Sequence, residues 1–217
     1  MDKLTVYIPN LPERTDRIRS ITHQFAGREE FDLHIVPAIR HVIGAYGQWK
    51  TFVSIVRKEA EKNQPYFIFC EDDHVFTNNY EFDYLTKCII EADKYEADIL
   101  CGGIGLVKDP IQCGEHLFWM RTFNGMQFTV IFRRFYQRIL NSDQSEGYIC
   151  DNYLSELSDN KFVMYPFISK QKEFGYSDIT IYNNEKGHIN RCFLNVNNTL
   201  KAVAKVKNYY ESITTEL

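Results

Sequence analysis

The regular alternation of strand-like and helix-like segments in the first half of the chain most constrains its fold. Four runs rich in β-branched, aromatic and aliphatic residues predict strands, at residues 4–10, 33–39, 66–70 and 98–103. Three intervening segments have apolar residues three and four positions apart, the period of an amphipathic helix, at residues 13–25, 44–63 and 81–95. Strands that alternate with helices predict an α/β domain with a mainly parallel central sheet flanked by helices.

The second half is less regular, but nothing in it marks a domain boundary. We predict strands at residues 116–122, 126–132 and 161–167, and helices at residues 133–140, 147–157 and 201–213. An Asn124-Gly125 pair lies between the first two of these strands, where a turn is expected. The chain has 217 residues, 44% of them hydrophobic, and neither an internal repeat nor a low-complexity linker. A single domain over residues 1–217 is therefore expected.

The charge and the cysteine pattern limit the classes of partner and location. A formal net charge of -4 gives no sign of a nucleic-acid partner. The six cysteines are scattered, without a C-x-x-C pair, which favours reduced cysteines in the cytoplasm. The chain shows neither a secretory leader nor an apolar stretch of membrane-spanning length. We therefore expect a cytoplasmic protein, in which the sequon at Asn197 has no role.

Three consecutive acids follow the third predicted strand. The strand YFIFC, residues 66–70, is continuously apolar, as in strands buried on both faces, and Glu71, Asp72 and Asp73 come directly after it. Ligands of open α/β sheets lie at the carboxyl ends of the strands, where these acids are expected. Magnesium and manganese take carboxylate oxygens and leave positions for substrate phosphates. The pattern is compatible with metal or phosphate chemistry and, equally, with an exposed acidic loop.

Other acid-dependent enzyme classes fit less well. A haloacid-dehalogenase-type nucleophile needs an Asp-x-Asp pair, whereas His74 stands two residues after Asp72. A receiver domain carries its acidic pair after the first strand. No Walker phosphate loop, H-E-x-x-H or G-x-S-x-G occurs. We interpret His74 itself as a hydrogen-bonding residue rather than a metal ligand.

Several segments match one family pattern in order along residues 6–179. They are VYIPNLPERTDRI, GAYGQWKTFVSIVRKEAE, FIFCEDDHVF, NGMQFTVIFRRFYQRIL, ICDNYL and YPFISKQKEFGYSDI. Together they resemble glycosyltransferase family 25, which contains lipopolysaccharide and collagen galactosyltransferases. The second segment keeps Gly44 and Gly47 but has Gln48, Phe52 and Val53 where the family carries small or polar residues and His.

The resemblance implies a fold and a reaction. The fold would be of the GT-A type, known from nucleotide-diphospho-sugar transferases, with a donor-binding half at about residues 1–110 and an acceptor-side half at about residues 111–217. The reaction would transfer a sugar, with inversion, from a nucleotide diphosphate to a glycan or lipopolysaccharide hydroxyl. By family analogy the sugar is galactose, the nucleotide is uridine diphosphate, and the protein works at the inner face of a membrane.

The resemblance also implies roles for residues near the donor. Asp73 would be the direct ligand of Mn²⁺ or Mg²⁺, Asp72 a ligand or ribose partner, and Glu71 a supporting acid. Three residues of the first motif would lie close to the nucleotide: Asn10, Arg14 and Arg17. The two arginines can meet phosphate or face water, and for Arg17 the residue type favours a solvated helix face.

An inverting transfer also needs a general base beside the acceptor hydroxyl. Asp151, near the start of a predicted helix, is the first candidate, and Glu146 is the second. The alternative for Asp151 is an acid favoured there by the helix dipole. His188 is a further candidate metal ligand, because GT-A enzymes often use a residue late in the chain. Ser177 and Asp178 are expected to shape the same cleft.

Two other functions remain open. One is a catalytically silent relative that binds a nucleotide or sugar, and the other is a metal-dependent phosphohydrolase, which would need a second acidic cluster. Lys201, Lys205 and Lys207 on the last predicted helix can contact an anionic membrane, or face water. The sequence does not indicate an oligomeric state.

Overall fold

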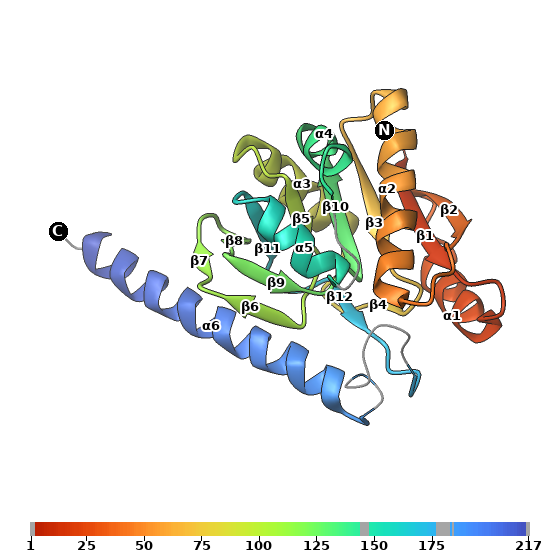
Figure 1. Cartoon of the computed structure of the whole chain (residues 1–217). Helices are drawn as coiled ribbons and strands as arrows, with labels where there is room; N and C mark the ends of the chain where they lie inside the picture. Colours follow the sequence, from red (N-terminus) through yellow and green to blue (C-terminus); the bar gives the residue numbers. More distant parts are fainter. Residues whose placement is uncertain (1–2, 144–147, 177–182, 184, 216–217) are drawn as a thin grey trace.

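The computed structural model describes residues 3–143, 148–176, 183 and 185–215. Its main feature is an eight-stranded sheet in the order β2-β1-β3-β10-β5-β11-β8-β7 (Figure 1). These strands are β1 (Leu4–Asn10), β2 (Phe31–Pro37), β3 (Tyr66–Cys70), β5 (Ile99–Cys101), β7 (Ile111–Gln112), β8 (Leu117–Trp119), β10 (Phe128–Phe132) and β11 (Lys161–Met164). Only β8 and β10 of this sheet run against the common direction. The predicted class, an α/β fold with a mainly parallel central sheet flanked by helices, is confirmed.

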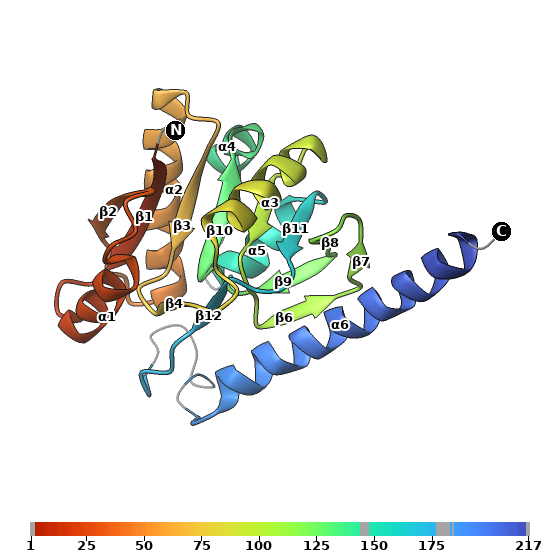
Figure 2. The same ribbon diagram turned by 180° about the vertical axis from the view of Figure 1, so that it is seen from behind.

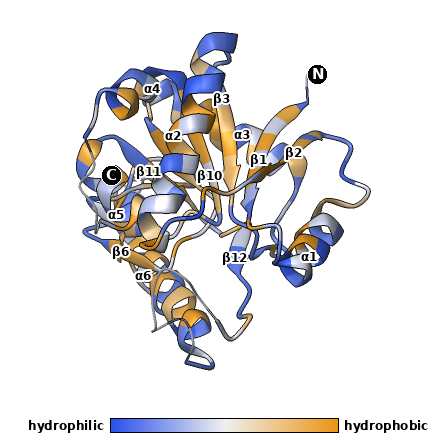
Figure 3. Cartoon of the chain, turned by 45° about the vertical axis from the view of Figure 1, so that its right-hand side comes forward, coloured by the Kyte–Doolittle hydropathy of each residue, from blue (hydrophilic) through white to orange (hydrophobic). Residues whose placement is uncertain are grey.

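Helices cover both faces of this sheet. They are α1 (Thr15–Phe25), α2 (Gly44–Lys62), α3 (Phe82–Lys94), α4 (Arg133–Leu140), α5 (Cys150–Leu157) and α6 (His188–Thr215). The strand β3 explains the layering, because its side chains alternate between two cores. Phe67 and Phe69 pack on the side of α2, α4 and α5, whereas Ile68 and Cys70 pack on the side of α1 and α3. Hydrophobic colour accordingly concentrates on the central strands (Figure 3).

Two small sheets lie at the edge of the main one. In the first, β4 (His74–Phe76) pairs with β12 (Ser169–Gln171); in the second, β6 (Leu106–Lys108) pairs with β9 (Thr122–Asn124). The prediction of one strand over residues 116–122 was wrong, because this segment divides between β8 in the main sheet and β9 outside it. The divided segment returns the chain to the main sheet through the Asn124-Gly125 turn.

The last helix is longer than the sequence predicted. We expected residues 201–213, whereas α6 spans His188–Thr215 and runs along one side of the molecule before projecting beyond it (Figures 1 and 2). Val196 and Leu200 attach it to the larger core. The Nζ atom of Lys207 donates to the carbonyl of Gly114 at 3.4 Å. Within the described residues, no helix is both long and apolar enough to cross a membrane. Contact with a membrane surface stays a prediction.

The first turns of α2 hold the segment at residues 38–43. The hydroxyl of Thr51 accepts from the Ile39 amide at 2.8 Å and donates to the Gly47 carbonyl at 2.8 Å. Gly47 permits this approach, since a Cβ atom there would lie 2.4 Å from the Ile39 carbonyl oxygen. The second glycine of the GAYG segment is therefore required by packing.

We predict that Gly47→Ala destabilises the protein by about 1–3 kcal/mol, because the new methyl group must push the backbone of residues 38–43 away. Denaturant unfolding measures this difference. Gly105→Ala is the matched control, since a Cβ atom there would make only ordinary contacts of 3.7–3.8 Å. Equal stability of the two variants would contradict the role assigned to Gly47.

Candidate functional site

A cleft of about 850 Å³ lies at the sheet edge where β1 and β3 end. Its walls come from parts of the chain far apart in sequence: the segment at residues 38–43, the start of α2, the turn before β10, and the starts of α5 and α6. The predicted residues that line it are Arg14, Arg17, Glu71, Asp72, Asp73, Asp151 and His188.

Asp72 and Asp73 are held by a buried arginine. Arg17 Nη1 donates to Asp72 Oδ1 at 2.7 Å and to Asp73 Oδ2 at 3.0 Å, and all three residues are buried. Asn10, the last residue of β1, donates from Nδ2 to Asp72 Oδ2 at 2.8 Å. Both oxygens of Asp72 are therefore engaged. The solvated helix face considered for Arg17 is wrong, because this side chain turns inward to the acids.

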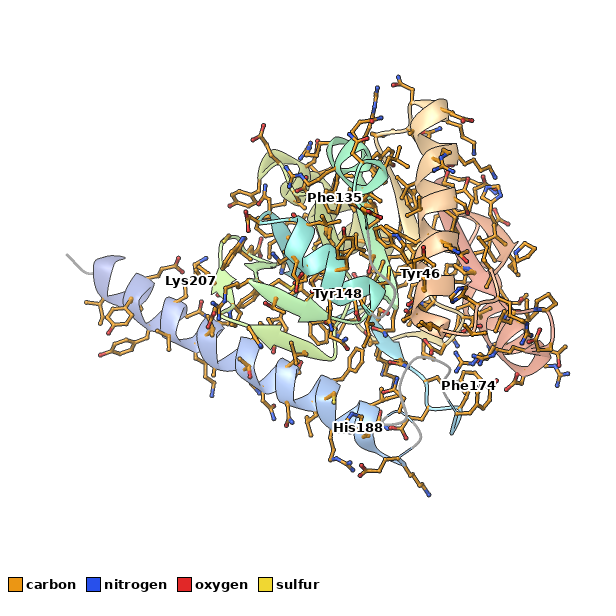
Figure 4. The ribbon with its side chains drawn as sticks, in the orientation of Figure 1. Tyr46, Phe135, Tyr148, Phe174, His188 and Lys207 are labelled. Carbon is orange, nitrogen blue, oxygen red and sulfur yellow. The ribbon has the colours of Figure 1, made fainter. Side chains whose placement is uncertain are left out.

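A strap at residues 172–176 covers Arg17. The guanidinium carbon lies 4.9 Å from the ring centroids of both Phe174 and Tyr176, and Nη2 donates to the Tyr176 carbonyl at 3.1 Å. Phe174 lies on this strap beside α1 (Figure 4). The two aspartates raise the pKa of Arg17 above its ordinary value, against the effect of burial. Arg17 is a fixed cation at the floor of the cleft.

Asp73 retains an oxygen without a partner. Its Oδ2 accepts from Arg17 and, at 3.2 Å, from Gln171 Nε2, whereas Oδ1 has no hydrogen-bond partner among the described residues. Burial raises the pKa of Asp73 to about 6, although Arg17 opposes the shift. An unpaired buried carboxylate oxygen is costly unless a ligand or cation meets it.

Glu71 turns away from this ion pair to two amides. Gln48 Nε2 donates to its Oε1 at 2.7 Å, and Gln127 Nε2 donates to its Oε2 at 3.0 Å. Burial raises the pKa of Glu71 well above its ordinary value, and the charges of Asp73, Asp151 and Asp72 raise it further. Glu71 is thus a carboxylate set among amide groups.

Asp151 lies near the start of α5, as predicted. The Gly125 amide donates to its Oδ2 at 2.6 Å, and the Asn152 amide donates to its Oδ1 at 2.8 Å. Burial raises the pKa of Asp151 despite these bonds. Gly125 has a φ of +111°, and a Cβ atom there would lie 2.6 Å from Gln127 Oε1. One glycine therefore positions Asp151 and makes room for the amide that holds Glu71.

The remaining predicted residues fall in three groups. His188 begins α6 (Figure 4), with Nε2 3.6 Å from Cys192 Sγ. His74 does not line the cleft; it is buried among phenylalanine rings, with Nδ1 2.7 Å from Ser169 Oγ, as the hydrogen-bonding interpretation expects. Glu146, Ser177 and Asp178 lie outside the described residues.

The chemistry of the floor fits one cation. No three His, Cys, Asp or Glu side chains among the described residues are grouped closely enough to hold a metal ion by themselves. Four buried or partly buried carboxylates nevertheless line the cleft, and only two of them pair with Arg17: Glu71 and Asp151 lie outside the ion pair that Asp72 and Asp73 make. Mg²⁺ needs only one or two protein carboxylates when phosphates and waters complete its shell. The unpartnered Asp73 Oδ1 and the excess negative charge meet that requirement.

Sequence reasoning missed three glutamines. Gln48 was noticed only as a departure from a motif, yet it contacts Glu71. Gln127 follows the Asn124-Gly125 turn as a single polar residue before an apolar strand, a weak signal. Gln171 had no local signal, because only the pairing of β12 with β4 brings it to Asp73.

Comparison with known proteins gives distant similarity only. No protein-family model matches the chain, and no curated protein matches it. Solved structures similar to it include apo UDP-glucose pyrophosphorylase, with 12% identity, 88% of this chain and 80% of that chain covered, and a TM-score of 0.45. A glycosyltransferase involved in glycosylation of the major capsid of PBCV-1 has 9% identity, coverage of 74% and 81%, and a TM-score of 0.44. Similarity at this level identifies neither ligand nor activity.

We predict that Glu71→Gln stabilises the metal-free protein at about pH 8 by roughly 1 kcal/mol, an effect that disappears towards about pH 4. The folded pKa of Glu71 lies above its ordinary 4.5, so the folded protein binds more protons than the unfolded chain above that pH. Its stability therefore falls as pH rises through this window. Denaturant unfolding at several pH values measures the difference. A variant less stable than the wild type at high pH would contradict the claim that the ionised Glu71 destabilises the folded protein.

We predict that Gly125→Ala impairs the site more than the fold. A side chain at this φ is strained and collides with Gln127, so Asp151 and Glu71 both lose their positions. The expected result is at least about a tenfold loss of ligand affinity or activity, because small misplacements in a site are costly. Gly105→Ala, which also changes a cleft residue, is the control and should retain function.

Proposed function

We propose that the cleft binds a nucleotide diphosphate sugar together with Mn²⁺ or Mg²⁺, and that the protein transfers the sugar to an acceptor hydroxyl with inversion. The observation that carries this proposal is the unpartnered Oδ1 of Asp73 in a cleft where acids outnumber the buried cation among the described residues. A divalent ion would meet that oxygen and compensate both the acids and the diphosphate. The ordered family 25 motifs support the same function.

Asp73 is the residue we assign to the ion. When bound, the ion would neutralise charge on the diphosphate as it leaves. For Asp72 we propose a positioning role in place of the ligand or ribose-partner role that the resemblance implies, because Arg17 and Asn10 each bond one of its oxygens. We assign Asp72 to fixing Arg17, and Arg17 to fixing Asp73. Asp72 and Arg17 therefore position the ligand, and Asp73 binds the ion.

Arg14 supplies a second positive charge to the cleft and is less buried than Arg17. It lines the cleft, and its guanidinium carbon lies 4.9 Å from the Tyr176 ring centroid. An arginine beside a diphosphate can donate two parallel hydrogen bonds to it. We therefore assign Arg14 to the diphosphate of the donor.

Asp151 is the general base in this proposal. Its pKa is raised by burial, which brings a carboxylate nearer to the range useful for proton transfer, while two backbone amides orient it. The acceptor oxygen attacks the anomeric carbon, the bond to the diphosphate breaks, and the hydroxyl proton passes to Asp151. Glu146, the second candidate, stays an alternative.

The finer identities rest on the family resemblance. These are galactose as the sugar, uridine diphosphate as its carrier, a glycan or lipopolysaccharide acceptor, and work at the cytoplasmic side of a membrane. The donor and acceptor halves, at about residues 1–110 and 111–217, are inherited in the same way. Strands from both ranges interleave in one sheet, since β10 lies between β3 and β5.

A silent nucleotide-binding relative is the second candidate. It is favoured by the tight pairing of Asp72 and Asp73 with Arg17, which leaves few oxygens for a metal. Such a protein would bind the donor without hydrolysing or transferring it. Phosphate release from simple phosphoesters would instead indicate the phosphohydrolase.

The proposal predicts metal-dependent binding of uridine diphosphate through Asp73. Calorimetry should show binding with Mn²⁺ and a loss of at least about tenfold in affinity without Mn²⁺ or in Asp73→Asn, since the carboxylate charge holds the ion. Asp109→Asn, an exposed acid paired with Arg121, is the control and should bind as the wild type does. Binding that is indifferent to both metal and Asp73 would overturn the site assignment.

A further prediction concerns Asp151. In donor hydrolysis or transfer assays, Asp151→Asn should lower kcat by about 10²–10⁴-fold, the usual contribution of a general base. Affinity for uridine diphosphate should stay within about twofold, because the binding contacts remain. A variant with normal kcat would remove Asp151 from the mechanism.

A further inference from the structure

The contacts of Glu71 differ from those of a metal-binding acid. Its two oxygens each accept an amide hydrogen, from Gln48 at 2.7 Å and from Gln127 at 3.0 Å. Amide hydrogens carry positive charge and would face any cation placed against this carboxylate. The supporting metal role predicted for Glu71 therefore fits its surroundings poorly. Ionised carboxylates offer about four acceptor positions, so each oxygen can still accept another donor.

Gln127 provides an independent indication of a ligand. It lines the cleft with 3% of its surface exposed, and its Oε1 has no hydrogen-bond partner among the described residues. Its Nε2 is used twice, by Glu71 at 3.0 Å and by Gln171 Oε1 at 3.2 Å. These two bonds fix which atom of the amide is the oxygen. A buried amide oxygen without a hydrogen-bond partner is uncommon, and a donor on a bound group would satisfy it.

This group of side chains combines acceptors with donors. Glu71 and Gln127 Oε1 can accept from a ligand, whereas the donor is Gln48 Nε2, which uses one of its two hydrogens on Glu71; both hydrogens of Gln127 Nε2 are already used. The diphosphate of a nucleotide sugar offers only acceptors at neutral pH and would be repelled by an ionised Glu71. A hydroxyl group both donates and accepts, so adjacent hydroxyls of a sugar satisfy such a surface.

We propose that Glu71, Gln48 and Gln127 form a hydroxyl-binding subsite that recognises the sugar of the donor and determines which sugar is accepted. This inference rests on the proposed function, which it refines. Glu71, Asp73 and Asp151 line the same cleft, and Gly125 joins Gln127 to Asp151. A sugar at Glu71 would share the cleft with Asp73, which we assign to the ion, and with Asp151, which we assign as the base.

Gln48 makes this subsite a property of this chain. It stands in the second motif at a departure from the family pattern. It lies at the start of the second turn of α2, and contacts of Gly47 and Thr51 hold this part of the helix. Its position is thereby fixed relative to β3. We infer that the departure changes sugar choice rather than abolishing binding.

The test separates sugar recognition from nucleotide binding. Calorimetry with Mn²⁺ measures the affinities for uridine diphosphate, UDP-galactose, UDP-glucose and their monodeoxy derivatives in wild type, Gln48→Ala and Gln127→Ala. Uridine diphosphate affinity should stay within about twofold in both variants. The ratio of UDP-sugar affinity to uridine diphosphate affinity should fall by at least about tenfold, since a sugar hydroxyl loses a buried partner. Gln137→Ala, an exposed residue on α4, is the control.

The deoxy donors provide a readout that a merely structural role would not move. One deoxy donor should bind wild type more weakly, yet bind Gln127→Ala no more weakly than the parent sugar does. Normal nucleotide binding with an unchanged sugar contribution in both variants would overturn the subsite and leave the proposed function intact. Absence of nucleotide binding in wild type would overturn the proposed function instead.

If the wild type binds no nucleotide, the subsite is tested directly with methyl galactoside and methyl glucoside. Side-chain amide NMR signals of Gln48 and Gln127 should shift on addition of one of these sugars. Signals that do not move with either glycoside, in a wild type that also binds no nucleotide sugar, would reject the sugar subsite.

Discussion

The ion pair between Arg17 and the two aspartates after β3 is the interaction on which the cleft depends. Arg17 comes from α1, Asp72 and Asp73 follow β3, and the strap at residues 172–176 covers the guanidinium with two aromatic rings. Separating such a buried pair leaves an uncompensated charge, which costs about 3–5 kcal/mol. The pair therefore orders three distant segments and aims the remaining oxygen of Asp73.

The direction of β10 determines what lies beside those acids. Because β10 runs antiparallel to β3, its first residue, Phe128, pairs with Cys70, the last residue of β3. The turn before β10 thus reaches the carboxyl edge of the sheet, where Gln127 meets Glu71 and Gly125 meets Asp151. A purely parallel sheet would carry this turn to the opposite edge. The candidate base and the acidic cluster are neighbours for this reason.

The sequence predicted what depends on local pattern. The strand YFIFC, its burial on both faces, the helix at α2 and the location of Asp151 near a helix start all follow from residue types and spacing. The inward turn of Arg17 and the glutamines around Glu71 could not be predicted, because they depend on contacts between residues far apart in the sequence. Arg17 and Asp72 are 55 positions apart, and Gln48 and Glu71 are 23 positions apart. Helical periodicity does not tell which polar residue faces a site and which faces water.

The central claim is that a divalent ion and a diphosphate meet at Asp73. The most direct measurement is a crystal structure with uridine diphosphate and Mn²⁺, using the anomalous scattering of manganese to locate the ion. The account predicts a manganese peak bonded to the Asp73 carboxylate, with the diphosphate on its far side and Arg17 still paired with Asp72. Manganese and nucleotide bound elsewhere, or nucleotide in the cleft with no ion at Asp73, would contradict it.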